Sequence, residues 1–560
     1  MGRISVLLMG LAGVLLAVNS FAQSVDPGAI RSREQEKQEY YRFEEKLKEG
    51  KTPVPEKGQV EDRTNGETSP GPEAADRTIF VARIETNPSD ILSLEEVEGI
   101  TRKYEGREVS IRDLFEAVRE INRLYAAKGF IAARAILPPQ KVERGVIRIE
   151  LVEGRIGKIL IKGNEHTKES FFTNRLSLKS GDLVRVDRLE RDLVFLNSTS
   201  DVETRAELGA GETPGTTDLT LKVQEPGNYQ ATLFSDNAGS DTVGLYRFGL
   251  MLGSSSLLGY RDRLNLNAYF TKHRGTVAGS ASYNVPVGTL GTRLDLSYSY
   301  NRIKVISGPY EVLDISGESP DLGFDLNHPF IAGPAFRLNG FTGFHYSKST
   351  TEFDGVRLYE TEVRTVNAGF DIQSLDAQGF WFFSNRLTRG LHVLSGDSRF
   401  LKYNPFLLRQ QTAGEDLVLV FRGSAQLTRE DNLPPSEQFQ IGGASSVRGY
   451  PEGYLIGDTG YLISAELFFP LPFPDAGIAG FDLRNRLKGV VFADHGGAFP
   501  YKPGGGSMTH HDYITGTGIG LTGSISKHFT GRLILGIPIT NRGHLKDDCL
   551  FHFSVQTDLF

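Results

Sequence analysis

Two short motifs in the last quarter of the chain carry opposite charges that could neutralise each other. The tetrapeptide Val447-Arg448-Gly449-Tyr450 comes first, and the tripeptide Phe492-Ala493-Asp494 begins 45 residues later. An arginine in a water-poor interior costs several kcal/mol unless a carboxylate meets its guanidinium group, so Arg448 and Asp494 are expected to pair. Either motif alone is equally well explained by an ordinary loop arginine or a solvated carboxylate. Both together, in this order and in a strand-rich region, favour a buried ion pair.

A second polar group, His510-His511-Asp512, has residue types that bind metal ions. Adjacent residues on a strand point to opposite faces, and the neighbouring run Gly504-Gly505-Gly506 is typical of a loop, so we expect no metal site. The sequence also lacks a Gly-x-Ser-x-Gly elbow, a phosphate-binding loop and a His-Glu-x-x-His motif. We therefore expect neither an enzyme nor a bound cofactor.

Composition and charge restrict the class of protein further. The 560 residues carry a formal net charge of -7, which excludes a basic surface that would attract nucleic acid. Residues 1–22 combine Arg3, the apolar run Ile4 to Val18 and small residues near Ala22, which predicts a signal peptide and export. No later run approaches the ~20 apolar residues of a membrane helix, so a membrane-embedded protein would have to be a β-barrel. The single cysteine, Cys549, excludes an intramolecular disulfide.

The region that follows Ala22 divides into two parts of different composition. Within residues 23–50 a charged helix is predicted from Glu34 to Glu49, ended by Gly50, with a narrow apolar stripe of Tyr40, Phe43 and Leu47. Residues 51–77 contain four prolines among Gly, Glu, Thr and Ser, a composition that cannot bury a core. We interpret this second part as a flexible linker.

Residues 78–154 predict a small α/β unit. A strand is expected from Ile79 to Ile84, and a helix begins at Ser110 with a capping-box-like start and ends at Gly129. Two closing strands are expected, at Ile131 to Leu137 and at Val146 to Val152, where residues alternate between apolar and polar.

Residues 155–226 repeat this pattern. A strand from Ile156 to Ile161 precedes a helix capped by Asp187, and the two helix caps lie 77 residues apart. Leu189, Leu193 and Leu196 are expected to face the core. Two further strands, Val202 to Leu208 and Asp218 to Val223, complete the second α/β unit.

Residues 227–560 have a different sequence pattern, in which apolar and polar residues alternate repeatedly. In Leu264 to Phe270 and in Leu294 to Tyr300 apolar residues alternate with Asn, Asp and Ser, as suits a barrel wall with lipid outside and water inside. Near the end, apolar residues from Phe551 to Leu559 alternate with polar ones, and the chain ends on Phe560. Phe560 has the parity of the polar face, so it does not fit the alternation of this strand.

These motifs together resemble the outer-membrane transporters of two-partner secretion, the haemolysin secretion/activation proteins. The resemblance is carried by Val447–Tyr450 with Phe492–Asp494, by the segment Gly457 to Leu467, and by Lys128–Gln140, which with the closing Val152–Gly154 is similar to periplasmic POTRA domains. It implies two POTRA domains, a sixteen-stranded barrel, and a loop that folds back so that Arg448 at its tip bonds Asp494 on the wall. Dividing 334 residues by sixteen gives about 21 for each strand and its connection, which leaves room for ~10 spanning residues.

The resemblance also implies a function. The POTRA domains would lie in the periplasm of a Gram-negative-type bacterium, capture one large exoprotein through its amino-terminal secretion domain, and pass it to a monomeric barrel held in outer-membrane lipid. The helix within residues 23–50 would occupy the pore at rest. We expect capture by strand addition to a free sheet edge at Ile131, Ala133, Ala135 and Leu137, because Pro138-Pro139 ends that strand.

Other functions fit less well. A barrel-assembly factor of the same superfamily is the alternative, although it would normally carry more POTRA copies, and residues 23–77 are too polar to contain a third one. A passive porin would need neither the α/β repeats nor the Arg448 and Asp494 pair. The identity of the exoprotein is not encoded in this chain.

Overall fold

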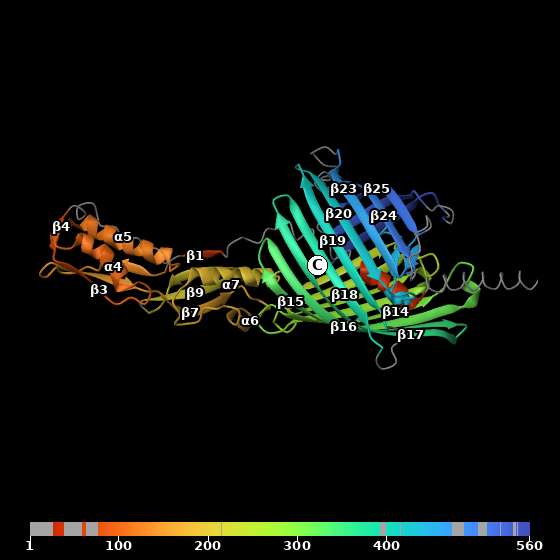
Figure 1. The fold of residues 1–560 in the computed structure, drawn as a ribbon, viewed down its shortest axis with the longest axis horizontal. Coiled ribbons are helices and arrows are strands. Elements are labelled where there is room, and N and C mark those ends of the chain that lie inside the picture. Colours follow the sequence, from red (N-terminus) through yellow and green to blue (C-terminus); the bar gives the residue numbers. More distant parts are fainter. Residues whose placement is uncertain are drawn as a thin grey trace, which may run out of the picture. The chain divides into compact units, whose positions relative to one another are not determined.

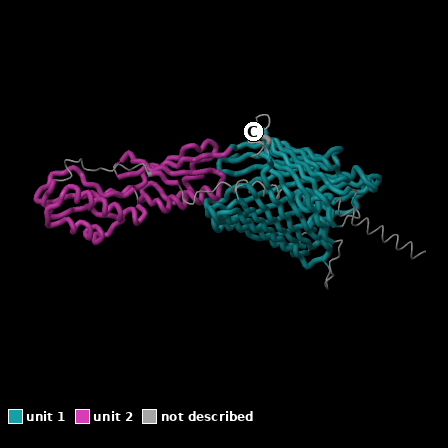
Figure 2. The backbone as a smooth tube through the Cα atoms, turned by 90° about the horizontal axis from the view of Figure 1, so that it is seen from above, with its two compact units in different colours: residues 1–53, 227–560 teal, residues 54–226 magenta. Residues whose placement is uncertain are grey.

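The computed structural model describes residues 26–37, 59–62, 77–130, 132–213, 215–392, 399–414, 416–472, 486–501, 512–526, 528–540, 545 and 547–560. The chain divides into two compact units (Figure 2), one made of residues 1–53 with 227–560 and one of residues 54–226. The expected signal peptide, residues 38–50 of the predicted helix, Ile131, and His510 with His511 lie outside the described residues. No helix in the described ranges is long and apolar enough to cross a membrane.

The first α/β module has more elements than the sequence pattern predicted. The expected strand Ile79 to Ile84 is two strands, β2 (Thr78–Val81) and β3 (Arg83–Thr86), because the Ala82 N–H donates to the Gly145 carbonyl between them. Helix α4 (Leu94–Thr101) was not predicted, although Ser93 and Glu96 form a capping box at its start.

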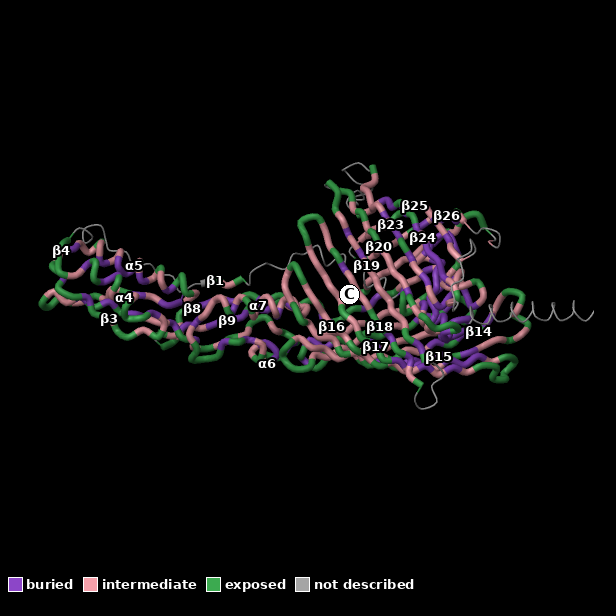
Figure 3. Tube along the Cα trace, viewed as in Figure 1, coloured by how far each residue is buried: buried purple, intermediate pink, exposed green. Residues whose placement is uncertain are grey.

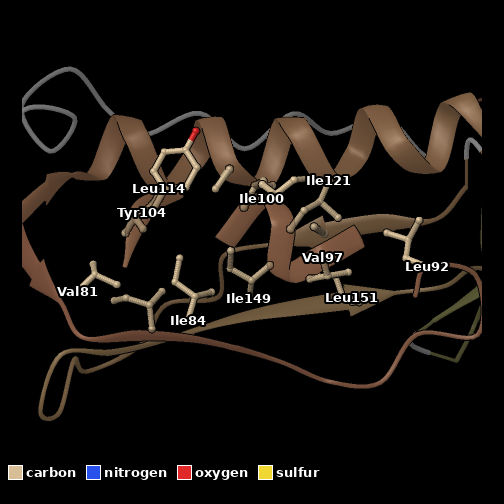
Figure 4. Close-up of a cluster of buried hydrophobic side chains, with 14 of the residues drawn as sticks. Val81, Ile84, Leu92, Val97, Ile100, Tyr104, Leu114, Ile121, Ile149 and Leu151 are labelled. Carbon is tan, nitrogen blue, oxygen red and sulfur yellow. The ribbon is translucent and has the colours of Figure 1, made fainter. Parts of the chain in front are cut away.

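The central helix of this module follows the sequence. Helix α5 (Ile111–Ala127) begins after Ser110, whose side chain accepts from the Asp113 N–H as predicted. Strand β2 pairs with β4 (Arg107–Ser110), and a mixed sheet has the order β3-β6-β5 with β6 (Val146–Val152) in the middle and β5 (Arg134–Ile136) at one edge. The apolar face of α5 and both sheets enclose one core, in which Leu114, Ile121 and Ile149 are among the side chains drawn in Figure 4.

The second module corrects the interpretation of residues 51–77 as a linker throughout. Val60–Asp62 form strand β1, which pairs in parallel with β8 (Glu203–Ala210), and Val60 packs against the module's core. The sheet order is β1-β8-β9-β7, with β7 (Arg155–Lys162) and β9 (Thr216–Gln224), and the helices are α6 (Glu169–Thr173) and α7 (Val186–Thr199). Asp187 is not the cap of α7, because the cap position is Arg185, which makes no capping bond.

The remaining strands close into one antiparallel barrel of sixteen (Figure 1). They are β10 (Tyr229–Asp236), β11 (Arg247–Ser255), β12 (Arg263–Thr271), β13 (Thr276–Pro286), β14 (Arg293–Lys304), β15 (Ile315–Ala332), β16 (Phe336–Phe353), β17 (Val356–Asp376), β18 (Gly379–Gly390), β19 (Leu401–Ala413), β20 (Leu417–Thr428), β23 (Thr459–Pro470), β24 (Leu487–Phe499), β25 (Tyr513–Ser526), β26 (Phe529–Pro538) and β27 (Leu550–Asp558).

The dyad alternation predicted for the barrel wall is confirmed. Leu266 and Phe270 on β12, and Leu296 and Tyr298 on β14, expose large apolar side chains two or four residues apart, as lipid-facing positions should. Strand β27 ends at Asp558, so Phe560 lies beyond it and its parity has no bearing on the strand's faces. Buried positions gather toward one end of the barrel (Figure 3), where two segments described below fill the interior.

Candidate functional site

The segment between β20 and β23 folds into the barrel and carries Arg448. It contains a short hairpin of β21 (Phe439–Ile441) and β22 (Leu455–Gly457). Its base is fixed by Asp458, whose carboxylate accepts the N–H groups of Leu433 at 2.9 Å and Tyr501 at 3.1 Å. The loop tip between the two hairpin strands is therefore held in a definite place against the wall.

The predicted pair of Arg448 and Asp494 is present. The guanidinium group donates two parallel bonds to the carboxylate, from Nε to Oδ2 at 2.7 Å and from Nη2 to Oδ1 at 2.7 Å. The backbone N–H of Arg448 also donates to Oδ2 at 3.1 Å. The arginine is 2 % exposed and Asp494 is 1 % exposed, so this bidentate pair is almost completely removed from solvent.

Glu466 on β23 is a second carboxylate partner that the motifs did not reveal. It accepts from Arg448 Nη1 and from Arg532 Nη2, the latter at 3.0 Å. Ser464 completes the group by donating to Asp494 Oδ1 at 2.7 Å. Burial alone would lower the pKa of Arg448, but Asp494 and Glu466 raise it above its ordinary value. We call Arg448, Ser464, Glu466, Asp494 and Arg532 the Arg448 cluster.

The other residues of both motifs shape the surroundings of this charge. The Phe492 ring lies under the guanidinium group, 3.6 Å from its carbon to the ring centroid, which is a cation–π contact. Val447 and Tyr450 are fully buried in an apolar cluster with Ile441 and Ile514, and the Tyr450 hydroxyl donates to the Thr515 carbonyl at 2.9 Å. Apolar side chains therefore seal the Arg448 cluster from water.

The loop tip contacts the wall at glycines. Gly449 has a φ of 96°, a left-handed conformation that side chains resist. On the wall, a Cβ atom at Gly516 of β25 would overlap the Arg448 carbonyl oxygen, and one at Gly536 of β26 would overlap the Gly449 nitrogen. The backbone of the tip can reach Asp494 only because these wall positions have no side chain.

A helix at residues 27–37 also lies inside the barrel, shown in red among the strands in Figure 1. The predicted start at Glu34 is therefore wrong. Asp26 caps the helix by accepting the Ala29 N–H at 2.9 Å, and Ser349 on β16 donates to the same carboxylate at 3.1 Å. Burial raises the pKa of Asp26, while those two hydrogen bonds oppose the rise.

Ion pairs to the wall hold this luminal helix. Arg31 pairs with Asp321 of β15 at 2.6 Å, and both side chains are buried. Glu34 pairs with Arg247 of β11, which also binds Asp236 of β10 at 2.6 Å. Burial alone would raise the pKa of Glu34, but Arg247 and Lys37 lower it overall. The helix thus contacts strands on one side of the wall through charges.

The luminal helix also binds the loop that carries Arg448. Arg33 donates to Gln440 Oε1 at 3.0 Å, and Gln440 donates back to the Ala29 carbonyl at 3.1 Å. Lys37 pairs with Glu452 at 2.9 Å. Polar contacts therefore join the helix to the loop, and each of the two segments is also bound to the barrel wall.

The edge predicted for cargo capture is not free. Strand β5 lies at a sheet edge, but it is only three residues long, and Ala133 and Ala135 are buried. The Ala133 N–H donates to the Phe130 carbonyl at 3.1 Å and the Ala135 N–H donates to Asn122 of α5 at 2.7 Å. Both donors that strand addition would need are used inside the module.

Among the residues that the structure describes, no group of three or more His, Cys, Asp or Glu side chains is arranged to bind a metal ion. Of the motif His510-His511-Asp512, only Asp512 is described.

Comparison with known proteins shows which protein families the chain matches. The family model "Haemolysin secretion/activation protein ShlB/FhaC/HecB" matches residues 215–523, and a ShlB-type POTRA domain model matches residues 79–154. The heme/hemopexin transporter protein HuxB of Haemophilus influenzae (strain 86-028NP) is 27% identical over 407 residues, which cover 70% of this chain and 71% of HuxB.

Solved structures show the same fold. The structure of CdiB from Escherichia coli aligns with a TM-score of 0.65 and 18% identity over 96% of this chain and 99% of CdiB. BamA from Haemophilus ducreyi lacking POTRA domains 1-3 aligns with a TM-score of 0.54 and 14% identity over 86% of this chain and 100% of that chain. The chain belongs to the haemolysin secretion/activation protein family ShlB/FhaC/HecB, the outer-membrane transporters of two-partner secretion.

Proposed function

We propose that the barrel exports one large partner exoprotein and that the luminal helix, residues 27–37, closes it at rest and leaves it during transport. The observation that carries this proposal is the nature of the helix contacts, which are ion pairs and hydrogen bonds through Arg31, Arg33, Glu34 and Lys37. Water can replace such contacts once the helix moves, at a net cost of about 1.5 to 3 kcal/mol for each bond to a charged group, because one hydrogen-bond partner is exchanged for another.

The Arg448 cluster has the complementary role in this proposal. It keeps the loop tip and the wall strands β23 and β24 together while the lumen empties. Arg448 binds carboxylates on both strands, Glu466 on β23 and Asp494 on β24, so separating the tip from the wall would leave Asp494 buried without its cation and Glu466 with Arg532 alone.

In this scheme the exoprotein is captured in the periplasm before the barrel conducts it. Residues 78–154 and 155–226 act as two periplasmic POTRA domains that bind the unfolded amino-terminal domain of the exoprotein, at a surface other than the β5 edge. The export step needs no bound cofactor in this scheme, and the barrel works as a monomer in outer-membrane lipid.

A reversible cross-link tests whether the helix must leave. A Cβ atom at Gly28 would lie 3.2 Å from the Cβ of Ser349 on β16, so a shift of a few tenths of an ångström would bring the two atoms into the ~3.5–4.5 Å range of disulfide bonds. The double variant Gly28→Cys and Ser349→Cys is made together with Cys549→Ser. Oxidation should stop secretion of the exoprotein, and reduction should restore it.

Each single-cysteine variant is the matched control and should secrete normally under both conditions. Normal secretion by the double variant, with the disulfide shown to be complete on a non-reducing gel, would refute helix departure. Loss of secretion in the reduced double variant would indicate that the substitutions, and not the cross-link, damage the barrel.

A further inference from the structure

The turn between β11 and β12, residues 256–262, exposes large apolar side chains where a turn normally carries polar ones. Leu257 is 57% exposed, Leu258 is 54% exposed and Tyr260 is 39% exposed. A neighbouring turn, between β13 and β14, exposes Leu290 at 69%. Apolar surface of this kind marks contact with another protein or with a membrane.

Both turns lie at the periplasmic end of the barrel. The POTRA domains lie in the periplasm and β10 follows them directly in the chain, so β10 begins at the periplasmic rim. Successive antiparallel strands alternate in direction, which brings the chain back to this rim after β11 and again after β13. The apolar side chains of the two turns therefore lie beside the periplasmic leaflet of the outer membrane.

The β11–β12 turn is folded over a buried carboxylate. Asp262 is 0% exposed, and it accepts the Leu258 N–H at 3.0 Å and the Tyr260 N–H at 3.4 Å. The hydroxyl of Tyr283 on β13 donates to the same carboxylate at 2.8 Å. Burying a carboxylate is costly unless donors satisfy it, and these three donors do so. The bonds to Asp262 therefore fix where the turn lies.

The position of Asp262 shows on which side of the wall the turn lies. Side chains alternate between the two faces of a strand, and Asp262 has the parity of Leu264 and of the exposed Leu266. Tyr283, which binds Asp262, is the partner of Leu264 in the ladder of β12 and β13, so it shares that face. The turn is therefore folded onto the lipid-facing side of the wall and not across the lumen.

The exposed side chains of the turn continue the lipid-facing band of the barrel. Leu252 on β11 and Leu266 on β12 are ladder partners on this face, and each is 40% exposed. The turn between β17 and β18 reaches the same rim but carries Asp376 and Gln378, both exposed. Apolar side chains are therefore a property of this part of the rim and not of every periplasmic turn.

We propose that the β11–β12 turn is a lipid anchor, in which Leu257, Leu258 and Tyr260 insert into the periplasmic leaflet and Asp262 holds the turn in place. The partner is phospholipid, because the apolar surface of the turn is continuous with the band that phospholipid covers. A tyrosine, with an apolar ring and a polar end, suits the boundary between acyl chains and headgroups.

The anchor lies where the barrel begins. Arg261 in the turn donates to Asn228 Oδ1 at 3.1 Å, and the Ser255 N–H donates to the Asn228 carbonyl at 2.7 Å. Asn228 is the residue immediately before β10, so the turn fixes the depth at which the chain leaves the membrane toward the POTRA domains. This inference goes beyond the proposed function and does not depend on export of an exoprotein.

Fluorescence quenching by brominated lipid tests this proposal in the full chain. The sequence has a single tryptophan, Trp381, which is replaced by phenylalanine. A new indole is then introduced by Leu258→Trp or, as the matched control, by Gln378→Trp in the turn between β17 and β18. Each variant is inserted into phosphatidylcholine vesicles with or without bromine on the acyl chains near the headgroup. Bromine should quench the Leu258→Trp variant at least about twofold and the Gln378→Trp variant little.

The other outcomes identify a different occupant of the turn. Equal quenching of the two variants would overturn the anchor. Fluorescence of Leu258→Trp that ignores bromine but changes when the amino-terminal domain of the exoprotein is added would show contact with the passenger. A change with protein concentration would show contact with a second copy, and either result would overturn the lipid assignment. The shift in gel migration on heating checks that the barrel of each variant is folded.

A second measurement tests the role of Asp262. Tyr283→Phe removes the hydroxyl that donates to this carboxylate, so Asp262 should draw water to the lipid face and the turn should leave the leaflet. In the Leu258→Trp background, quenching by bromine should fall about twofold. Tyr298→Phe is the control, because Tyr298 is a tyrosine of β14 that is 48% exposed on the same face. Equal quenching with either phenylalanine would contradict the role assigned to Asp262.

Discussion

The two segments that fill the barrel are held by different kinds of contact. The loop tip combines the Arg448 cluster with apolar packing, since Phe439, Ile441, Val447 and Tyr450 are all buried beside it. Among its described residues the luminal helix buries one large apolar side chain, Ile30, and relies on charges for the rest.

In the proposed scheme, the difference in apolar burial decides which of the two segments leaves the barrel. Each buried apolar side chain contributes about 1.5 to 3 kcal/mol, so the apolar part of the cost is several times larger for withdrawing the loop tip than for withdrawing the helix. Charged contacts of the helix can be replaced by water, whereas exposed apolar surface cannot be compensated in that way. In the proposed scheme we call the contact of the loop tip with the wall, where apolar residues surround the Arg448 cluster, the permanent joint. We call the contact of the luminal helix with the wall, where such apolar packing is small, the releasable joint.

Breaking the permanent joint should have the largest effect. Arg448→Ala leaves Asp494 buried without its cation and leaves Glu466 with Arg532 as its remaining partner, which costs roughly 3 to 5 kcal/mol, and secretion should fall to background with the barrel still inserted. Arg448→Lys keeps the charge but loses the bidentate geometry, so it should secrete at an intermediate level. Quantifying exoprotein in the medium against barrel in the outer membrane measures both, and wild-type secretion by Arg448→Ala would refute the role of the cluster.

The glycine contact offers a second way to break the same joint without touching a charge. Gly536→Ala places a methyl group against the Gly449 nitrogen, and overpacking of this kind costs about 1 to 3 kcal/mol. We expect a clear reduction in secretion, smaller than for Arg448→Ala. Gly531→Ala on the same strand is the control, because the nearest atom to its new methyl group would be 3.8 Å away. Equal secretion by both alanine variants would show that the tip does not need the bare wall.

The releasable joint should respond in the opposite direction. Arg31→Ala removes the ion pair with Asp321, and hydrogen bonds to charged groups contribute about 1.5 to 3 kcal/mol, so the open fraction of channels should rise about tenfold or more. Secretion should persist. Planar-bilayer recordings measure the change, and Gln35→Ala, which loses only a contact of 3.5 Å to the same Asp321, should change it little. A channel that stays closed after Arg31→Ala would place the restraint elsewhere.

Asp26 should give the smallest effect, and one that depends on pH. Its pKa is raised in the seated helix, so seating is favoured by the protonated form below the ordinary value of 3.8 and weakens as pH rises through the raised value. Asp26→Asn keeps an oxygen that accepts the Ala29 N–H but cannot ionise. It should therefore open less often than the wild type near neutral pH. The two channels should converge in acid, and a difference that is constant with pH would contradict this assignment.

The contacts of the loop tip could be predicted from the sequence better than the contacts of the luminal helix. Arg448 and Asp494 stand in two motifs of distinctive composition, so their pairing could be inferred. Glu466 could not, because a carboxylate at an alternating strand position has no local signature until the loop folds against it. The contacts of Gly516 and Gly536 on the wall could not be predicted either, because nothing in the sequence distinguishes these two residues among 63 glycines.

The errors at the amino-terminal end have a common cause. Prediction of the helix relied on an apolar stripe, but the described helix is held by charges, so the start was placed at Glu34 although Asp26 followed by Pro27 is a standard helix-opening pair. Strand β1 was missed because a single valine, Val60, anchors it in a polar segment. Contacts that form only with partners distant in sequence leave little trace in local pattern.

The pairing of β1 with β8 has a consequence for how the channel closes again. Lys37 in the luminal helix and Val60 in β1 are 23 residues apart, so the chain between them can extend to at most roughly 80 Å. A helix that has left the barrel therefore stays on a short tether whose other end is fixed in its own molecule. Its local concentration near the lumen is then set by the length of this segment and not by the amount of transporter in the membrane. In the proposed scheme, resealing is then a first-order event within one transporter.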